Sequence, residues 1–157
     1  GMIACPKEDR RLGVIEFHKE RLLLAMHPSH ELAAKKEVSI KSLQNQPMIL
    51  FEPDQATRKL IDRILKRYRV TVKPIMELDN IETINRAVEA NIGLSILPEP
   101  SIAQEVSAKA ILAKPFAEEQ LHRPVGIIYR KGKVFAEPVK RLLDLLKSPP
   151  KDFGQKV

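Results

Sequence analysis

Residues 77–98 read ELDNIETINRAVEANIGLSILP and contain the signals for a helix, both of its ends and a following strand. Asp79 and Asn80 belong to the residue types that cap helix N-termini, because their side-chain oxygens accept hydrogen bonds from the first free backbone N–H groups. Apolar residues then recur at the spacing of one helix face, at Ile81, Ile84, Ala87 and Val88. The stretch predicts an amphipathic helix that starts beside residue 80 and packs on a core.

The end of this helix is marked as clearly as its start. Asn91 and Gly93 flank the expected stop, and both residue types tolerate the left-handed backbone conformation that is common just past a helix. Residues 94–97, LSIL, then form an apolar run of strand length, which Pro98 closes. A helix that leads directly into a buried strand is a building unit of α/β folds.

Short apolar runs elsewhere in the chain predict the other strands. These strands are expected at residues 21–26, 48–51, 70–78, 109–113 and 123–129. Pro74 favours an edge position or a bulge for the strand that contains it, because proline has no N–H group to donate to a neighbouring strand.

Helical segments separate the predicted strands. Asp54 is a candidate N-cap for a long helix, and Ser39 can cap a short helical turn at residues 40–43. The apolar stripe of the long helix comprises Leu60, Ile61, Ile64, Leu65 and Tyr68. Further helices are expected at residues 101–107 and 134–146. The alternation of strands and helices predicts an α/β fold with a largely parallel sheet.

The composition is that of an ordinary globular chain, since 43% of its 157 residues are apolar and 30% are charged. The single cysteine, Cys5, excludes an internal disulfide and a cysteine-pair metal site, which fits a reducing compartment. No stretch approaches the roughly 18 consecutive apolar residues of a membrane-spanning helix, and no secretory signal is evident. We therefore expect a cytoplasmic protein.

The net charge of +7 arises from 27 Lys and Arg against 20 Asp and Glu. Such an excess can favour polyanions, because cations that neutralise phosphates release counterions. The basic residues are nevertheless spread along the chain, with local concentrations at residues 58–69 and 130–133. The first of these alternates with apolar positions like a solvated helix face, so ordinary surface charge is preferred over a nucleic-acid footprint.

The sequence contains none of the common catalytic or cofactor motifs. Its six glycines are scattered and form neither a G-x-G-x-x-G fingerprint nor a Walker loop, and no G-x-S-x-G elbow occurs. His27 and His30 stand three residues apart, but Pro28 lies between them and no third His or Cys is near, so a loop is favoured over a metal site. We expect no metal, no cofactor and no enzyme activity.

The candidate ligand site lies where two predicted strands end. Ligands of open α/β sheets bind in the crevice outside the carboxyl ends of the strands. These ends carry Glu52, Asp54 and Gln55 after one strand and Asp79 and Asn80 after the next. Helices that start there would direct N–H groups into the crevice and favour anionic ligands. For each residue taken alone, simple helix capping is the alternative interpretation.

The order of these segments resembles the effector-binding region of LysR-type transcriptional regulators. In that family a strand leads into an H-P-L-A-like loop, to which residues 27–33, HPSHELA, are similar. A hydrophobic stretch follows, similar to residues 40–49. The most specific motif, V-x-x-G-x-G-I-x-x-L-P, is similar to residues 88–98, with Asn91 in the place where the family often has its first glycine. The resemblance runs from about residue 12 to 146.

The resemblance implies a type 2 periplasmic-binding-protein-like fold, in which two α/β lobes are joined by two crossover strands and enclose an effector cleft. Residues 33–108 would form lobe II, and residues 1–32 and 109–147 would form a remnant of lobe I. The strand–helix units that begin the family's first lobe, and its winged helix-turn-helix domain, would precede residue 1. The first lobe is therefore expected to be incomplete and the chain truncated, with a disordered tail at residues 148–157.

The resemblance also implies a function. The chain would be the effector-binding and oligomerisation domain of a bacterial transcriptional regulator that senses a small molecule without catalysis. DNA would be bound only through a helix-turn-helix domain absent from this chain. The effector would contact Phe51, Glu52, Pro53, Asp54, Gln55, Asn80, Ile81 and Leu97. A solute-binding receptor of the same fold and a basic nucleic-acid-binding module are the alternatives.

A homodimer or higher oligomer is expected as well, because members of the family dimerise through these lobes. An incomplete first lobe would leave apolar side chains of two strands uncovered. These side chains are Leu22, Leu23, Leu24, Ile127 and Ile128. Exposed apolar surface of this extent is unusual for a monomer, so either a second chain covers it or these strands are rearranged.

Overall fold

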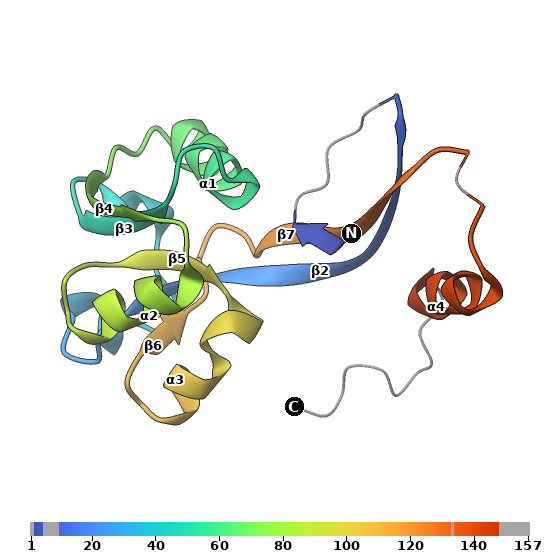
Figure 1. Ribbon diagram of the computed structural model, residues 1–157. Helices are drawn as coiled ribbons and strands as arrows, with labels where there is room; N and C mark the ends of the chain where they lie inside the picture. Colours follow the sequence, from blue (N-terminus) through green and yellow to red (C-terminus); the bar gives the residue numbers. More distant parts are fainter. Residues whose placement is uncertain (1, 5–9, 133, 148–157) are drawn as a thin grey trace. The chain divides into compact units, whose positions relative to one another are not determined.

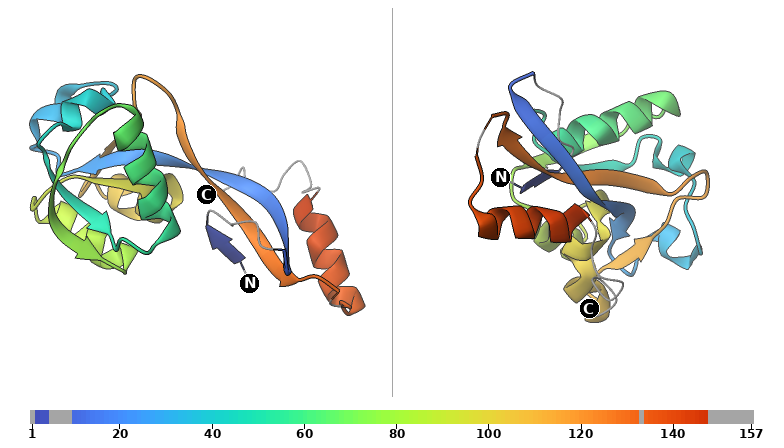
Figure 2. Two further views of the ribbon diagram at one scale, coloured as in Figure 1. Left: turned by 90° about the horizontal axis from the view of Figure 1, so that it is seen from above. Right: turned by 90° about the vertical axis from the view of Figure 1, so that its right-hand side faces the viewer.

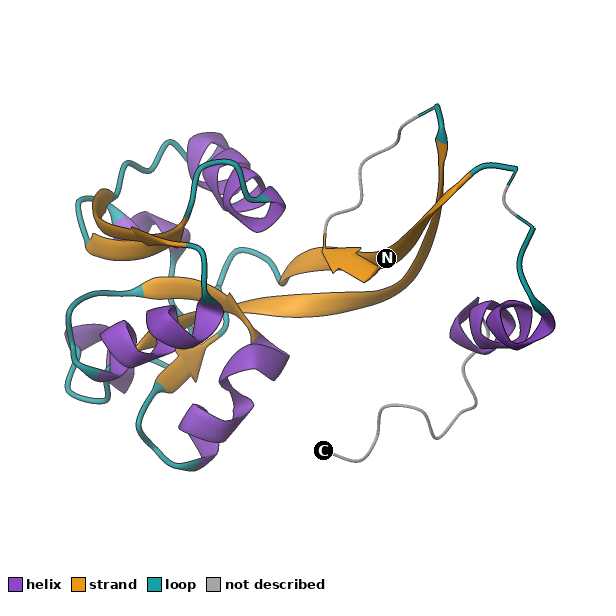
Figure 3. Cartoon of the chain, viewed as in Figure 1, coloured by secondary structure: helices purple, strands orange, loops and turns teal. Residues whose placement is uncertain are grey.

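The computed structural model describes residues 2–4, 10–132 and 134–147 (Figures 1 and 3). The chain divides into two compact units, of which the first comprises Gly1–Lys19 with Pro124–Val157 and the second comprises Glu20–Arg123. The second unit contains the whole of the expected lobe II, residues 33–108, and extends beyond it at both ends. The assignment of lobes stays a prediction, and the expected tail lies outside the described residues.

The strands of the second unit pair in two ways. The C-terminal half of β2 (Leu12–Met26) runs antiparallel to β5 (Ser95–Pro98) and to β6 (Leu112–Lys114). In contrast, β3 (Pro47–Phe51) and β4 (Lys73–Leu78) are parallel. The prediction of a largely parallel sheet is therefore wrong for the pairings of β2. Parallel neighbours need a crossover connection, and an intact helix supplies one between β3 and β4.

Helices and 3₁₀ turns cover these strands. The crossover helix is α1 (Ala56–Arg67), and α2 (Ile81–Glu89) follows β4; both contact β3 (Figures 1 and 2). The shorter segments are η1 (Glu31–Ala34), η2 (Ile40–Leu43), η3 (Glu99–Ile102) and α3 (Ala103–Ser107). The α/β class predicted from the sequence is confirmed.

The helix starts follow the sequence at two positions and depart from it at a third. Ser39 caps η2, and the Asn80 side chain caps α2 by accepting hydrogen bonds from two backbone N–H groups. The prediction of Asp54 as the cap of α1 is wrong, because the helix begins at Ala56 and Gln55 takes the N-cap position without a side-chain cap bond. A turn causes this shift, since the Gln55 N–H donates to the Glu52 carbonyl at 3.1 Å.

Backbone geometry confirms two further predictions. Asn91 has a φ of 57° just past α2, and the N–H of Ile92 donates back to the Ala87 carbonyl at 3.1 Å, as in a Schellman C-cap. Between β3 and β4 the register shifts, because Met48 lies opposite Pro74 whereas Ile49 lies opposite Met76. The residue between these two partners is extra, so Pro74 borders a bulge.

The core of the second unit contains most of the buried apolar side chains. Leu22, Leu23 and Leu24 are only 1%, 6% and 0% exposed. The prediction that these three leucines are uncovered is therefore wrong, because β5 and β6 pair with this half of β2 and enclose it. The other two side chains of that prediction, Ile127 and Ile128, are half-buried.

The first unit is built on a short antiparallel pair. Residues 125–127 of β7 (Leu121–Arg130) pair with β1 (Met2–Ala4) (Figures 1 and 2). The ring of Tyr129 packs edge-on against Phe135 at a centroid distance of 5.2 Å. The helix α4 (Glu137–Lys147) has exposed apolar side chains at Val139, Leu142 and Leu145. Among the helices that the structure describes, none is long and apolar enough to cross a membrane.

A carboxylate far along the chain completes the cap of η2. Glu118 accepts hydrogen bonds from the Ser39 hydroxyl and from the Ile40 N–H, the latter at 3.0 and 3.1 Å to its two oxygens. Burial opposes ionisation of this carboxyl, but these hydrogen bonds outweigh burial and hold the pKa of Glu118 below its ordinary value. The charged form of Glu118 therefore stabilises the folded state.

We expect E118Q to lower the free energy of unfolding at pH 7 by about 1 kcal/mol, because the charge-assisted hydrogen bonds of the carboxylate are lost. The loss is no larger because Glu118 is exposed and water screens its charge. Folding lowers the pKa of Glu118. The contribution of this carboxylate to the free energy of unfolding is therefore complete above the unfolded glutamate pKa of about 4.3, and it disappears as the pH falls through the lower pKa of the folded state. Urea unfolding of both proteins between pH 2 and 8 measures this. A difference that persists in full at the acidic end would contradict the assignment, and E37Q, at an exposed position, is the control.

Candidate functional site

The carboxyl ends of β3 and β4 lie at one edge of their sheet. Phe51 and Leu78, the last residues of the two strands, are paired, and the Glu52 N–H donates to the Leu78 carbonyl at 3.1 Å. The strand β5 runs in the same direction, because Met48 and Leu94 form a parallel bridge directly before it. The structure therefore places the chain segments that leave β3 and β4 side by side, at the position where open α/β sheets bind ligands.

A side-chain hydrogen bond joins these two segments. The Gln55 amide Nε2 donates to the backbone carbonyl of Asp79 at 3.0 Å. Glu52, Pro53 and Asp54 are exposed beside it, and Gln55 is half-buried. We call residues 52–55 and 79–81 the rim. Of the predicted site residues, the structure brings together on the rim Glu52, Pro53, Asp54, Gln55, Asn80 and Ile81.

The two helix starts at the rim differ in their hydrogen bonding. At α2, the Asn80 Oδ1 accepts from the N–H groups of Glu82 at 2.8 Å and Thr83 at 3.2 Å. At α1, the N-cap residue Gln55 makes no side-chain cap bond, because its amide is directed to Asp79. The first N–H groups of α1 are therefore the better donors for an anionic ligand group.

The remaining predicted site residues lie below the rim. Phe51 is 4% exposed and Leu97 is 0% exposed, opposite Leu23 of β2. Their side chains belong to the core that supports the rim. Ile81 is half-buried and packs against the same core, so it connects the exposed residues of the rim with the buried Phe51 and Leu97.

Arg58 holds the end of β3 in place, although its position in the sequence predicts a solvated helix face. Its side chain is 12% exposed, and Nη1 donates to the Phe51 carbonyl and to Glu77, both at 2.7 Å. Nε donates to Asp62 at 2.9 Å. Burial lowers the pKa of Arg58, but the hydrogen bonds to Glu77 and Asp62 outweigh it and raise the pKa overall. The spacing of Arg58 and Asp62 by four residues was the available signal in the sequence.

A second cation reaches the start of α1 from β7. Arg123 donates from Nε to Glu20 at 2.6 Å and from Nη1 to the Thr57 hydroxyl at 3.0 Å. The side chains of Arg123 and Glu20 are 16% and 18% exposed, and Thr57 is 4% exposed. No sequence motif indicated this cluster, because its members are 66 and 103 residues apart.

The histidines of the HPSH sequence have local partners. His27 Nδ1 is hydrogen-bonded to the Ser29 hydroxyl at 2.7 Å, and His30 Nδ1 accepts from the Leu32 N–H at 3.2 Å and thereby caps η1. Over residues 2–4, 10–132 and 134–147, the structure has no group of three or more His, Cys, Asp or Glu that could hold a metal ion.

The fold is that of the effector-binding domains built on the type 2 periplasmic-binding-protein plan. The regulatory domain of CcmR from Synechocystis PCC6803, in complex with 2-PG, matches with a TM-score of 0.85 and 23% identity over 97% of this chain and 73% of that chain. The effector-binding domain of QuiR, in complex with shikimate, matches with a TM-score of 0.80 and 16% identity over 92% of this chain and 69% of that chain.

Residues 1–149 match the LysR substrate binding domain, and the chain belongs to this family. The malolactic fermentation system transcriptional activator of Lactococcus lactis is 26% identical over 141 residues, which cover 88% of this chain and 47% of the relative. The HTH-type regulator YwbI of Bacillus subtilis is 28% identical over 158 residues, 97% of this chain and 52% of the relative. The chain thus spans about half the length of the curated relatives it matches.

Proposed function

We propose that the chain binds a small-molecule effector at the rim and forms the sensing part of a transcriptional regulator, without catalysis. The observation that carries this proposal is the hydrogen bond from Gln55 to the Asp79 carbonyl, which joins the segments after β3 and β4. Family membership supports it, as do the complexes of CcmR with 2-PG and of QuiR with shikimate. The effector is a compact molecule that hydrogen-bonds with the rim.

The charges of the rim bear on which molecules it accepts. Glu52, Asp54 and Asp79 are exposed carboxylates at its edge, and they disfavour a second negative charge close by. The first N–H groups of α1 have the opposite effect. An anionic group of the effector therefore binds at the start of α1, and hydroxyl or amino groups face the three carboxylates.

The core residues Phe51 and Leu97 contribute by supporting the rim from below. Asn80 and Ile81 do so from the side of α2, because the Asn80 cap fixes the start of that helix. All eight residues named from the sequence remain in the proposed site. Its accessible part consists of the exposed Glu52, Pro53, Asp54 and Asn80 and the half-buried Gln55.

A thermal-shift screen tests effector binding. The compounds are 2-PG, shikimate, small carboxylates, amino acids and aromatic acids, and a compound at 100 times its Kd adds about 2.7 kcal/mol of stability. For a compound that binds, we expect Q55A to lower the affinity at least about tenfold, since the rim segments lose their connection. Isothermal titration measures the two affinities.

The matched control is Q46A, which also removes a half-buried glutamine amide with one side-chain partner, Glu31, at 3.3 Å. We expect this variant to retain the affinity of the unchanged protein. A loss of equal size in Q46A and Q55A would contradict the proposed position of the site. Failure of every compound to shift the melting midpoint would contradict effector binding by this chain.

For the whole protein, we propose a cytoplasmic regulator in which a helix-turn-helix domain outside this chain recognises DNA. The expected division into lobe II and a remnant of lobe I belongs to this proposal. We also propose a homodimer, supported by the exposed apolar side chains of Val139, Leu142 and Leu145 on α4, which are 40%, 54% and 55% exposed. Light scattering on the 17.8 kDa chain tests the dimer, and a monomer that persists at high concentration would contradict it.

A further inference from the structure

The positive charge of the chain is concentrated in one of its two compact units. The first unit carries 12 Lys and Arg against six Asp and Glu, a net charge of +6. The second unit, about twice as long, carries 15 Lys and Arg against 14 Asp and Glu, a net charge of +1. Nearly all of the overall charge of +7 therefore belongs to the first unit.

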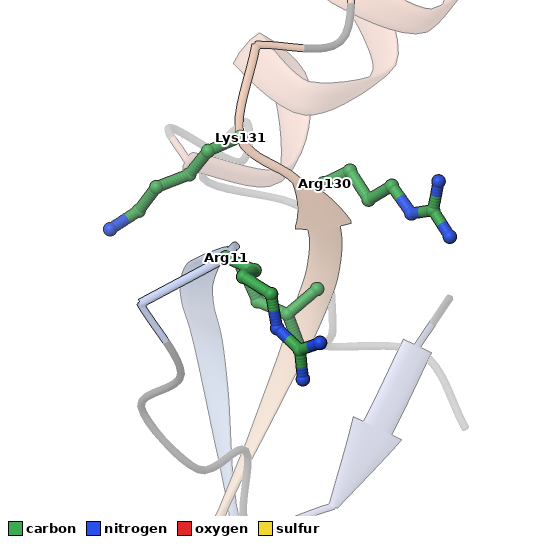
Figure 4. A pocket seen from close by; sticks show the side chains of 4 residues that line it. Arg11, Arg130 and Lys131 are labelled. Carbon is green, nitrogen blue, oxygen red and sulfur yellow. The ribbon is translucent and has the colours of Figure 1, made fainter.

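Some of the basic residues of the first unit lie at two adjoining strand ends. The Lys131 N–H donates to the Arg11 carbonyl at 3.0 Å, so the start of β2 and the end of β7 are joined there. Arg11, Arg130 and Lys131 are exposed and surround a hollow of about 630 Å³, together with Leu12 (Figure 4). Residues 10–12 and 130–132 together contain four Lys and Arg and no acidic residue. We call residues 10–12 and 130–132 the basic strand end.

The basic side chains do not converge on a single point. Arg130, the last residue of β7, and Lys131, in the turn that follows, extend to opposite sides of the backbone, and Arg11 extends in a third direction (Figure 4). A small anion would need several donors directed at one position. Cations that point in different directions can each meet a separate charge of a ligand whose negative charges are repeated at short intervals, as the phosphates of a nucleic acid duplex are.

We propose that the basic strand end binds the phosphate backbone of duplex DNA without sequence preference. Arg130 and Lys131 each neutralise a phosphate, and the Lys131–Arg11 backbone bond keeps them in place. The contacts carry no base recognition, because phosphate contacts position a protein on DNA and base contacts supply specificity. This inference rests on the first unit alone and is independent of the proposed effector site at the rim.

The test measures binding of the 157-residue chain to a labelled 20-base-pair duplex of random sequence between about 20 and 300 mM salt. We expect binding that weakens steeply with salt. Each lost phosphate contact lowers the slope of log K against log salt by about 0.9, so R130Q/K131Q is expected to lower it by about 1.8. At 50 mM salt this corresponds to an affinity loss on the order of 200-fold.

The matched control is K35Q/K36Q, which removes the same charge from two exposed positions of the second unit. The slope is expected to stay unchanged in this variant and to be retained in the charge-preserving variant R130K/K131R. Absence of binding at 20 mM salt, or equal losses in the two glutamine variants, would overturn the proposal. Equally tight binding of a poly-glutamate peptide would assign the surface to acidic proteins and overturn it as well. Melting midpoints identify any variant that fails to fold.

Discussion

R123A is expected to lower the free energy of unfolding by about 3 kcal/mol. The substitution leaves the Glu20 carboxylate without the guanidinium that lies 2.6 Å from it, and the side chain of Glu20 is only 18% exposed. It also removes the donor to the buried Thr57 hydroxyl. Removal of one partner from a largely buried ion pair is costly because the other charge stays desolvated without compensation.

Urea unfolding of R123A, E20A and the double variant measures this effect as a double-mutant cycle. The double variant is expected to be less destabilised than the sum of the two single variants, since it leaves no unpaired charge. R86A is the matched control. The N–O distance of the Arg86–Glu89 pair, 2.7 Å, is close to that of the Arg123–Glu20 pair, but the side chain of Arg86 is 72% exposed. Additive single effects, or an equal loss in R86A, would contradict the buried role of Arg123.

G93A is expected to lower the free energy of unfolding by about 2 kcal/mol. A Cβ atom at residue 93 would lie 2.9 Å from the Pro47 carbonyl oxygen and 2.8 Å from the Ile75 Cδ1 atom. That carbonyl accepts the Leu94 N–H at 3.0 Å and so joins β3 to the start of β5. The backbone must therefore move to admit a methyl group, and overpacking of this kind typically costs about 1–3 kcal/mol.

The control for this prediction is N91G, two residues earlier in the same turn. Asn91 has a φ of 57°, which glycine adopts more easily than asparagine, so N91G is expected to leave stability unchanged or to raise it by up to about 1 kcal/mol. Thermal and urea unfolding of both variants separate the lack of space at residue 93 from the demand for a positive φ at residue 91. Equal destabilisation by both substitutions would contradict the close approach of Pro47 as the cause.

The geometry at residues 91 and 93 accounts for the two glycine positions of the family motif. The motif often has glycine at both places, but only Gly93 is required by space, whereas Asn91 meets a conformational demand that asparagine satisfies. The sequence could therefore depart from the motif at residue 91 and keep the turn. Asparagine in place of glycine at residue 93 is instead expected to lower the free energy of unfolding.

Much of the local structure was predictable from the sequence. Ser39 and Asn80 cap helices where their types predict, Asn91 takes the left-handed conformation, and Pro74 borders a bulge. The rim segments after β3 and β4 were also predicted as neighbours, and the Gln55–Asp79 bond joins them. These features depend on a residue's own backbone preference and on partners within a few positions, or on the general rule for the ends of parallel strands.

Other features depend on the path of the chain through space. The antiparallel pairing of β2 with β5 and β6 buries Leu22, Leu23 and Leu24, which were expected to be uncovered because the family resemblance implies an incomplete first lobe. The contacts of Arg123 with Glu20 and Thr57 join residues 103 and 66 positions apart. Residue types and their spacing indicate which groups can interact within a segment. The direction of a strand and the pairing of residues far apart in the sequence are determined only when the whole core packs, because the contacts that stabilise them are contained in no local segment.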